Sequence, residues 1–188
     1  EMKRRHEVLL KHGATCLMAS INSVGLAGMI ELAKFSQLPI HAHRNGWGYL
    51  SRHPLLGWSF TAWSKIWRLA GADHMHVNGL ANKFSEPDDS VIESARSCFE
   101  PMFASKACTV MPVFSSGQSV AQVPGTYAAV NTTDLIVTAG GGILAHPGGP
   151  EAGVRALREA WDAALQGVPQ ADYARTHPAL SMAMKAAV

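Results

Sequence analysis

The stretch GADHMHVNGLANKF, residues 71–84, combines two histidines and a lysine in one short segment. His74 and His76 occupy alternate positions, and residues two apart in a strand point to the same face of a sheet. Glycine and asparagine then interrupt the apolar pattern, which indicates that the strand ends and a loop begins. Lys83 follows in this loop. The stretch therefore predicts a strand with two imidazoles on one face, followed by a loop that carries an ammonium group.

Short apolar stretches alternate with helical patterns on both sides of this strand. Further strands are expected over residues 16–23, 39–45, 109–116 and 134–141. Apolar residues at helical spacing predict helices over residues 24–35, 55–71, 87–102, 119–131 and 150–167. The expected apolar faces include Leu56, Phe60, Trp63 and Trp67 in one helix and Val154, Leu157, Trp161 and Leu165 in the last. This alternation predicts an α/β fold with a parallel sheet and right-handed crossovers.

Polar residues at the carboxyl ends of the expected strands favour a barrel over an open doubly wound sheet. They are Asn22 and Ser23, His43 and Arg44, His76 and Asn78, Ser115 and Ser116, and Gly140 to Gly142. Reactive groups at this end of every strand are typical of a (β/α)8 barrel, which needs about 250 residues. We therefore expect residues 1–169 to form the C-terminal part, about strands 4–8, of a TIM barrel. Residues 170–188 are expected to form a C-terminal tail.

The first segment, EMKRRHEVLLKHG at residues 1–13, has the pattern of the middle of an amphipathic helix. We therefore expect the chain to be a piece of a longer polypeptide, with the remaining strands upstream of Glu1.

Composition excludes several classes of partner. The formal net charge is +2 and no run of lysine and arginine occurs, so we expect no binding to nucleic acid or to an anionic membrane. No apolar run reaches the roughly 20 residues of a transmembrane helix. Cys16, Cys98 and Cys108 show no C-x-x-C spacing. They are interpreted as reduced thiols of a cytoplasmic protein.

The histidine pairs and the residues beside them carry the candidate chemistry. His43 and His76 lie nearer the strand ends and can bind a metal, hold an anion or move protons, whereas His41 and His74 fit packing positions in the barrel interior. Arg44 suits a phosphate or carboxylate, or forms a surface salt bridge. Lys83 is either a solvated lysine or the lysine of a mobile loop that neutralises developing negative charge.

A glycine-rich stretch, TAGGGILAHPGGP at 138–150, offers a second candidate anion site. Successive N–H groups directly after a strand can bind an anion, and the last loops of a barrel commonly hold phosphate. The stretch also fits G-x-G-x-x-A weakly, because His146 and Pro147 follow where a Rossmann helix should begin. The residues thus predict a phosphorylated ligand at Arg44, His76, Ser115 and the glycines. No Asp or Glu lies at an expected strand end, so ligands for a hard metal are expected elsewhere.

Four motifs in order resemble the RuBisCO large-chain superfamily: HAHR at 41–44, GADHMHVNGLANK at 71–83, PVFSSG at 112–117 and GGGILAHPGG at 140–149. The resemblance covers roughly residues 14–167. It implies that His43 takes part in proton transfer and that the Lys83 loop closes over the substrate. It also implies binding of substrate and phosphate by Arg44, His76, Ser115, Gly117, Gly140 and Gly141.

Two departures separate this sequence from true carboxylases. Trp47 stands where they carry a further histidine, and Gln118 and Ser119 interrupt their G-G-I-H pattern after the serine. The pattern is more similar to RuBisCO-like (form IV) proteins. Within these, NSVGLAGM at 22–29 and LPIHAHRNGWG at 38–48 resemble the branch that acts on 3-oxo-isoapionate 4-phosphate. The resemblance implies a lyase of carbohydrate metabolism that decarboxylates this compound, or transcarboxylates and hydrolyses it.

The family resemblance also implies components that this chain does not contain. A Mg²⁺ ion would stabilise an enediolate, and its ligands, including a carbamylated lysine, are expected upstream of residue 1. An N-terminal domain would complete the site across a homodimer, so the chain alone is expected to be inactive. Three alternatives remain open: the diketo-methylthiopentyl phosphate enolase of methionine salvage, a zinc-dependent barrel hydrolase that uses the H-x-H pairs, and a non-enzymatic fragment.

Overall fold

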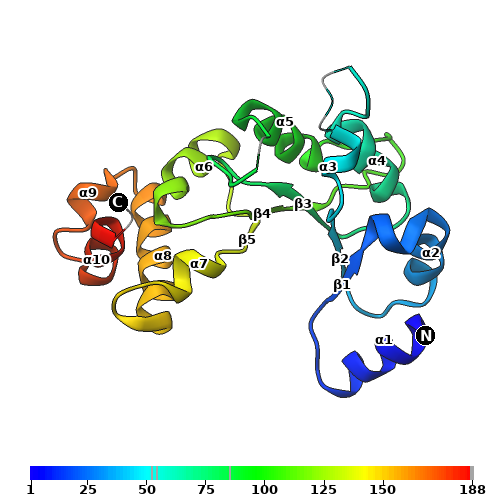
Figure 1. Cartoon of the computed structure of the whole chain (residues 1–188), viewed down its shortest axis with the longest axis horizontal. Helices are drawn as coiled ribbons and strands as arrows, with labels where there is room; N and C mark the ends of the chain where they lie inside the picture. The colour runs from blue at the N-terminus through cyan, green and yellow to red at the C-terminus, as the bar shows by residue number, and fades with distance from the viewer. Residues whose placement is uncertain (52, 54, 85, 187–188) are drawn as a thin grey trace. The chain divides into compact units, whose positions relative to one another are not determined.

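The structure is a computed structural model that describes residues 1–51, 53, 55–84 and 86–186 (Figure 1). The chain divides into two compact units. The first unit comprises Glu1–His76 and Glu93–Val113, and the second comprises Val77–Ile92 and Phe114–Val188.

The described residues form a sheet of five strands in the order β1-β2-β3-β4-β5. The strands are β1 (Leu17–Ser20), β2 (Ile40–His43), β3 (His74–Asn78), β4 (Met111–Phe114) and β5 (Ile136–Val137). Strand β2 pairs in parallel with β1 and with β3. The structure therefore confirms all five expected strands and the α/β class with a parallel sheet. Strands that follow one another along the chain lie next to one another in the sheet.

The helices of the first unit are α1 (Met2–Lys11), α2 (Ile21–Phe35), α3 (Gly48–Ser51) and α4 (Phe60–Leu69), and α5 (Asp88–Phe99) falls partly in each unit. The expectation that Asn22 and Ser23 end a strand is wrong, since α2 already begins at Ile21. Gly25 has a φ of +75° and interrupts this helix, a conformation that glycine adopts at little cost. Helix α2 therefore begins directly after β1 and has a kink at Gly25, near its first turn.

The two faces of the sheet in the first unit differ in polarity. Leu17, Ile40, Ala42 and Met75 are buried on one face. The alternate positions carry the histidines, because the side-chain period of a strand is two residues. The local alternation in the sequence is therefore enough to separate an apolar face from a histidine-bearing face.

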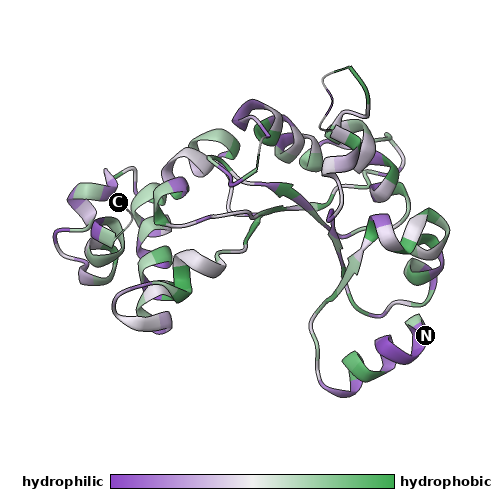
Figure 2. Cartoon of the chain, in the orientation of Figure 1, coloured by the Kyte–Doolittle hydropathy of each residue, from purple (hydrophilic) through white to green (hydrophobic). Residues whose placement is uncertain are grey.

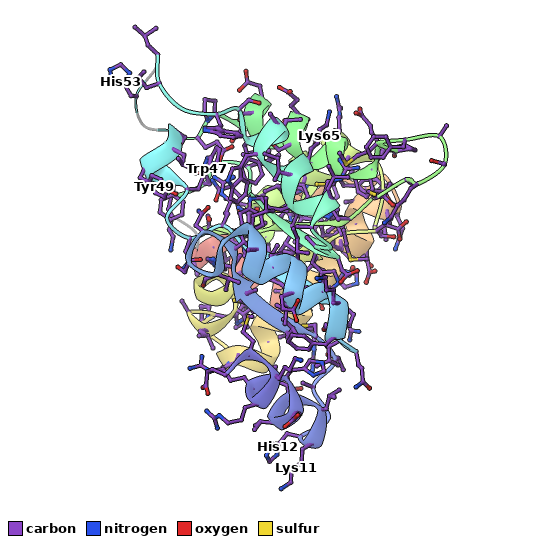
Figure 3. The ribbon with its side chains drawn as sticks, turned by 90° about the vertical axis from the view of Figure 1, so that its right-hand side faces the viewer. Lys11, His12, Trp47, Tyr49, His53 and Lys65 are labelled. Carbon is purple, nitrogen blue, oxygen red and sulfur yellow. The ribbon has the colours of Figure 1, made fainter. Side chains whose placement is uncertain are left out.

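Aromatic residues of α4 form a cluster with Trp47, which precedes the helix. Trp47 contacts Phe60 and Trp63, with ring centroids 5.1 and 4.8 Å apart, and Trp63 contacts Trp67 at 5.6 Å. The expected apolar face of this helix is confirmed at Phe60, Trp63 and Trp67 but is wrong at Leu56, which precedes the helix and is exposed. Figure 3 labels Trp47 together with Tyr49, which is exposed.

Arg68 is a charged side chain buried within the first unit. Only 3% of it is exposed, and its guanidinium donates to the carbonyl oxygens of Ser97, Glu100 and Cys108 at 2.6 to 2.7 Å. Ser97 lies in the last turn of α5, where carbonyls lack partners within the helix and attract a cation. Burial also raises the pKa of the neighbouring Cys98 thiol to about 12, so Cys98 is a protonated packing residue.

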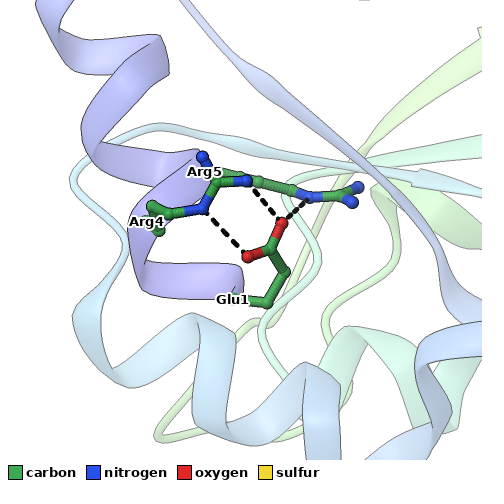
Figure 4. A network of polar contacts seen from close by, with 3 residues as sticks. All are labelled: Glu1, Arg4 and Arg5. Atoms are coloured by element: carbon green, nitrogen blue, oxygen red, sulfur yellow. Dashed lines mark hydrogen bonds and ion pairs between the residues drawn. The ribbon is translucent and has the colours of Figure 1, made fainter.

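Helix α1 has an exposed ion-pair network at its start. The Glu1 carboxylate accepts hydrogen bonds from Arg4 and Arg5 at 2.7 to 2.9 Å (Figure 4). These hydrogen bonds, from Arg4 first, lower the pKa of Glu1 to about 2. All of these groups are exposed, so the network contributes little to stability. The same helix buries His6, whose Nε2 accepts from the Gln37 backbone N–H at 3.0 Å.

The second unit contains η1 (Val120–Gln122), α6 (Val123–Val130), α7 (Gly140–Leu144), α8 (Gly149–Leu165), α9 (Gln170–Tyr173) and α10 (Pro178–Ala186). Its core includes Val120, Val123, Ala156, Ala160 and Leu180. The expected burial of α8 is supported at Leu157 and Trp161, which pack partly buried on this core, but is wrong at Val154 and Leu165, which are about half exposed. Small residues occupy the fully buried stripe instead, because they allow the neighbouring backbone to approach closely.

Hydrophobic and hydrophilic residues are interspersed along most of the helices (Figure 2). Among the described residues, none of the helices has both the length and the apolar character needed to cross a membrane.

Candidate active site

A cluster of histidines lies on the polar face of β2 and β3. The ring centroid of His76 is 4.4 Å from that of His43 and 4.7 Å from that of His41. His41 is directly opposite His74 in the sheet, with ring centroids 5.6 Å apart. The prediction that the two pairs share one face and converge from adjacent strands is therefore confirmed.

The rings of His41 and His76 are joined directly. Their Nε2 atoms lie 2.6 Å apart, and both side chains are buried. Burial, followed by the charges of His43, His41 and Arg44, lowers the pKa of His76 to about 3. The pKa of His41 is also lowered, mainly by burial and to a smaller extent by the charges of His74 and His43. Near neutral pH the pair is therefore uncharged, and one Nε2 donates its proton to the other.

His43 is half-buried, and its Nδ1 contacts Asn45. The Asn45 backbone N–H donates to this Nδ1 at 3.1 Å, and the Asn45 Oδ1 lies 3.0 Å from the same atom. The N–H suits an unprotonated Nδ1, and the Oδ1 suits a protonated one. Asn45 therefore offers a partner to His43 in either protonation state. The Asn22 side chain fixes this turn by donating to the Asn45 carbonyl at 3.1 Å.

Arg44 is held by aromatic rings beside the histidines. Its guanidinium carbon lies 4.2 Å from the centroid of Phe60 and 5.9 Å from that of Trp47. A guanidinium stacks favourably on such rings. Trp47, which departs from the carboxylase pattern, therefore packs as part of the apolar wall that orients Arg44.

In the second unit, the loop that carries Lys83 is attached to the segment after β4. The Lys83 backbone N–H donates to the Ser116 carbonyl at 3.1 Å, and the Lys83 backbone N lies 3.8 Å from where a β-carbon on Gly117 would stand. The Lys83 side chain is exposed, with its ammonium 5.6 Å from the Phe84 ring centroid. The backbone of the loop is thus fixed, while the ammonium is accessible.

Glu86 is a residue of this loop that sequence reasoning missed. Its carboxylate accepts from the Asn78 Nδ2 at 2.5 Å and from the Ser90 Oγ at 3.1 Å. Asn78 ends β3, so the loop returns a carboxylate to the end of the strand from which it departs. The Asn82 side chain donates to the carbonyls of Gly79 and Glu86 and closes this turn. The signal in the sequence is Asn82, Pro87 and Asp88 around this glutamate, since asparagine, proline and aspartate are typical of a structured turn.

Gln118 explains the second departure from the carboxylase pattern. It is buried, and its Nε2 donates to the Leu80 carbonyl at 3.2 Å. A β-carbon on Gly79 would overlap the Gln118 amide, so the glycine and the glutamine fit together. Ser115 is also buried, and its backbone N–H donates to the Asn78 carbonyl at 3.0 Å.

The glycines after β5 form a helix rather than the expected loop. Gly140, Gly141 and Gly142 begin α7, and none of them has a positive φ. A β-carbon on Gly142 would lie 2.5 Å from the Gln118 carbonyl oxygen, so this position needs close packing. Gly140 and Gly141 are exposed and face open space. The expectation of a loop is therefore wrong, because Gly140 and Gly141 form the exposed first turn of a helix.

The described residues do not fit a metal centre. Among residues 1–51, 53, 55–84 and 86–186, no group of three or more His, Cys, Asp or Glu side chains has the geometry to hold a metal ion. The H-x-H pairs thus lack the ligand arrangement that a zinc hydrolase requires. They equally lack the carboxylate set that Mg²⁺ prefers.

Comparison with known proteins identifies the family. Residues 1–186 match the model of the ribulose bisphosphate carboxylase large chain, catalytic domain. The chain is 54% identical over 184 residues to 3-oxo-isoapionate-4-phosphate transcarboxylase/hydrolase from Xanthobacter autotrophicus, covering 98% of this chain and 44% of that protein. It is 46% identical over 182 residues to 3-oxo-isoapionate-4-phosphate decarboxylase from Rhizobium rhizogenes, covering 96% and 43%.

A solved structure agrees with these similarities. The RuBisCO-like protein from Burkholderia fungorum superposes with a TM-score of 0.95 at 47% identity, over 98% of this chain and 46% of that one. The chain thus spans less than half the length of these relatives. Together with the match to the catalytic-domain model, this shows that the chain belongs to the ribulose bisphosphate carboxylase large-chain family.

Proposed function

We propose that this chain supplies part of the active site of a RuBisCO-like lyase that acts on 3-oxo-isoapionate 4-phosphate. The observation that carries the proposal is the convergence of His43 and His76, with ring centroids 4.4 Å apart, beside Arg44. The names of relatives at 46% and 54% identity support the choice of substrate. The departures from the carboxylase pattern at Trp47 and Gln118 are consistent with a reaction other than carboxylation.

In the first unit, Arg44 and His76 are proposed to bind phosphate and His43 to carry a proton. The guanidinium provides the permanent charge, since the pKa of His76, lowered to about 3, leaves that imidazole neutral at physiological pH. A neutral His76 can donate to a phosphate oxygen from Nδ1 in the tautomer in which its Nε2 accepts from the His41 Nε2. His43 suits proton transfer because Asn45 offers a partner to either form of its Nδ1.

In the second unit, Lys83 is proposed to stabilise negative charge on the reacting substrate. When a 3-oxo acid loses carbon dioxide, the C–C bond electrons pass to an enolate whose charge rests on the 3-oxo oxygen. The exposed Lys83 ammonium can stabilise that oxygen until a proton adds to the carbon. Ser115, Gly117, Gly140 and Gly141 are proposed to donate hydrogen bonds to the substrate or its phosphate.

Other parts of the complete enzyme are proposed to come from outside this chain. They include the ligands of a Mg²⁺ ion with a carbamylated lysine, and an N-terminal domain that completes the site in a homodimer. A cytoplasmic location is proposed with them. The described residues do not supply a Mg²⁺ site, so the proposed roles of this chain are those of its own side chains and backbone.

The test uses the protein expressed from its native reading frame, called the native protein below. It is incubated with Mg²⁺, bicarbonate and 3-oxo-isoapionate 4-phosphate, and the products are identified by mass spectrometry. Carbon dioxide or a cleaved carboxylate product is expected. No turnover by a folded, Mg²⁺-bound protein would refute this substrate and favour the methionine-salvage enolase, which is then assayed directly.

The role of Lys83 has its own test. Lys83→Ala should lower kcat at least about tenfold, because a charge that stabilises the transition state is removed. The matched control is Lys65→Ala in α4, which should keep native turnover. Turnover of Lys83→Ala equal to that of the control would remove the proposed role.

A further inference from the structure

Asn78 and Ser116 adopt an uncommon backbone conformation at the ends of neighbouring strands. Their φ values are +66° and +70°, a left-handed region that non-glycine residues seldom occupy. Such conformations persist where surrounding contacts fix them, and they concentrate at functional sites. Here the two side chains are bonded to each other, since the Ser116 Oγ donates to the Asn78 Oδ1 at 2.9 Å.

The carboxylate of Glu86 completes this arrangement. Asn78 uses both ends of its amide, because its Oδ1 accepts from Ser116 while its Nδ2 donates to Glu86 at 2.5 Å. The second Glu86 oxygen accepts from Ser90 at the start of α5. Glu86, Asn78 and Ser116 are called the loop brace below. The brace joins the end of β3, the loop after it and the segment after β4.

The brace is connected to Lys83 through the backbone. The Lys83 N–H donates to the carbonyl of Ser116, whose side chain belongs to the brace. Asn82, the residue before Lys83, donates to the Glu86 carbonyl at 2.9 Å. The Lys83 backbone is thus bonded to a residue of the brace, and its neighbour Asn82 is bonded to the backbone of Glu86, although the Lys83 side chain itself is exposed.

We infer that Glu86 is a positioning residue that holds the Lys83 loop in the conformation from which the lysine acts. The inference rests on the proposed function for the role of Lys83. Glu86 acts through other residues and touches no reacting atom. Its carboxylate accepts from the Asn78 amide, and the same amide accepts from the Ser116 hydroxyl and so orients Ser116. The Ser116 carbonyl in turn accepts from the Lys83 backbone N–H and fixes the position of that backbone.

The experiment compares three variants of the native protein. Glu86→Ala removes both acceptors. Glu86→Gln keeps an oxygen that accepts from the Asn78 Nδ2, and its NH2 group can donate to the Ser90 Oγ. This variant should therefore restore the brace. Asp89→Asn is the control, since Asp89 is an exposed carboxylate in the first turn of α5 whose Oδ1 accepts only from the adjacent Ser90 N–H in the described contacts.

Two measurements are made on each variant. Amide hydrogen exchange of residues 79–84 and 86 without substrate should be at least about fivefold faster in Glu86→Ala than in Asp89→Asn. Under turnover, kcat of Glu86→Ala should fall at least about fivefold while KM changes less than about twofold, because the loop lysine acts on the transition state. Glu86→Gln should match the native protein in both.

Each contrary result has a definite meaning. Exchange in Glu86→Ala equal to that in Asp89→Asn would show that Glu86 does not hold the loop. Faster exchange with unchanged kcat would overturn the positioning role and leave a purely structural one. If the native protein itself fails to turn over the substrate, the proposed function is refuted, and the exchange comparison still decides whether the brace exists.

Discussion

The Nε2 atoms of His41 and His76 lie 2.6 Å apart in the buried interior of the histidine face. A hydrogen bond at this distance needs one nitrogen with a proton and one without. Two imidazolium rings cannot make it, so the contact requires at least one neutral ring. This relation gives the fold a dependence on pH.

Folding stability should decrease as the pH falls below about 6.5, the ordinary pKa of histidine. The pKa of His76 in the folded protein is lowered to about 3, so between these values the unfolded chain binds a proton that the folded chain does not. The free energy of unfolding should therefore be highest above this window and fall by at most about 1.4 kcal/mol per pH unit within it. Urea unfolding at several pH values measures the slope.

His76→Gln should flatten this slope, because glutamine does not titrate. His12→Gln is the control, since His12 is an exposed residue that caps α1 (Figure 3). An equal pH dependence in the two variants would contradict the assignment of acid sensitivity to His76.

Replacing Arg68 should destabilise the protein strongly. Arg68→Met keeps much of the packing but removes the guanidinium that donates to the carbonyls of Ser97, Glu100 and Cys108. We expect the free energy of unfolding to fall by about 3 kcal/mol. Arg68→Lys should recover part of it, since an ammonium cannot reproduce the planar fork.

Arg4→Met is the matched control for Arg68 and should leave stability nearly unchanged, because Arg4 bonds only to exposed Glu1 among the contacts described (Figure 4). Urea denaturation of both variants provides the comparison. A similar loss of stability in both would show that burial of Arg68 has no special importance.

The features that were predicted from the sequence are those with a local pattern. Strand alternation at residues 74–78 placed His74 and His76 on one face, and the order of strands and helices gave the parallel sheet. The fit of His43 beside His76 followed from this register. Successive side chains of a strand point to opposite faces of the sheet, so an alternating sequence predicts the two faces directly.

The features that were missed depend on contacts between distant residues. Arg68 binds carbonyls 29 to 40 residues away, and no local pattern marks such a site. The glycines at 140–142 have low helix propensity, yet tight packing of Gly142 on Gln118 outweighs it. In α8, alanines rather than Val154 and Leu165 form the buried stripe, because the neighbouring elements approach closely there.

Adding a methyl group at Gly79 should displace the loop that carries Lys83. The new β-carbon would overlap the buried Gln118 amide and lie 2.6 Å from the Ser115 carbonyl oxygen. Gly79→Ala should therefore lower kcat and lower the free energy of unfolding by about 1–3 kcal/mol. Gly140→Ala is the control, because its β-carbon meets open space, and its stability should not fall. Equal stabilities of the two variants would contradict the tight fit between Gly79 and Gln118.

The Asn45 side chain should hold the His43 ring in the orientation from which it moves a proton. Asn45→Ala keeps the backbone N–H that donates to the His43 Nδ1 but removes the Oδ1 that lies 3.0 Å from the same atom. The loss should lower kcat about threefold to tenfold, because a proton carrier acts efficiently only when its ring is correctly oriented. Asn45→Asp keeps an oxygen at this position and should retain more of the native turnover. Equal kcat values of the two variants, measured while both stay folded, would show that the Asn45 Oδ1 does not position the His43 ring.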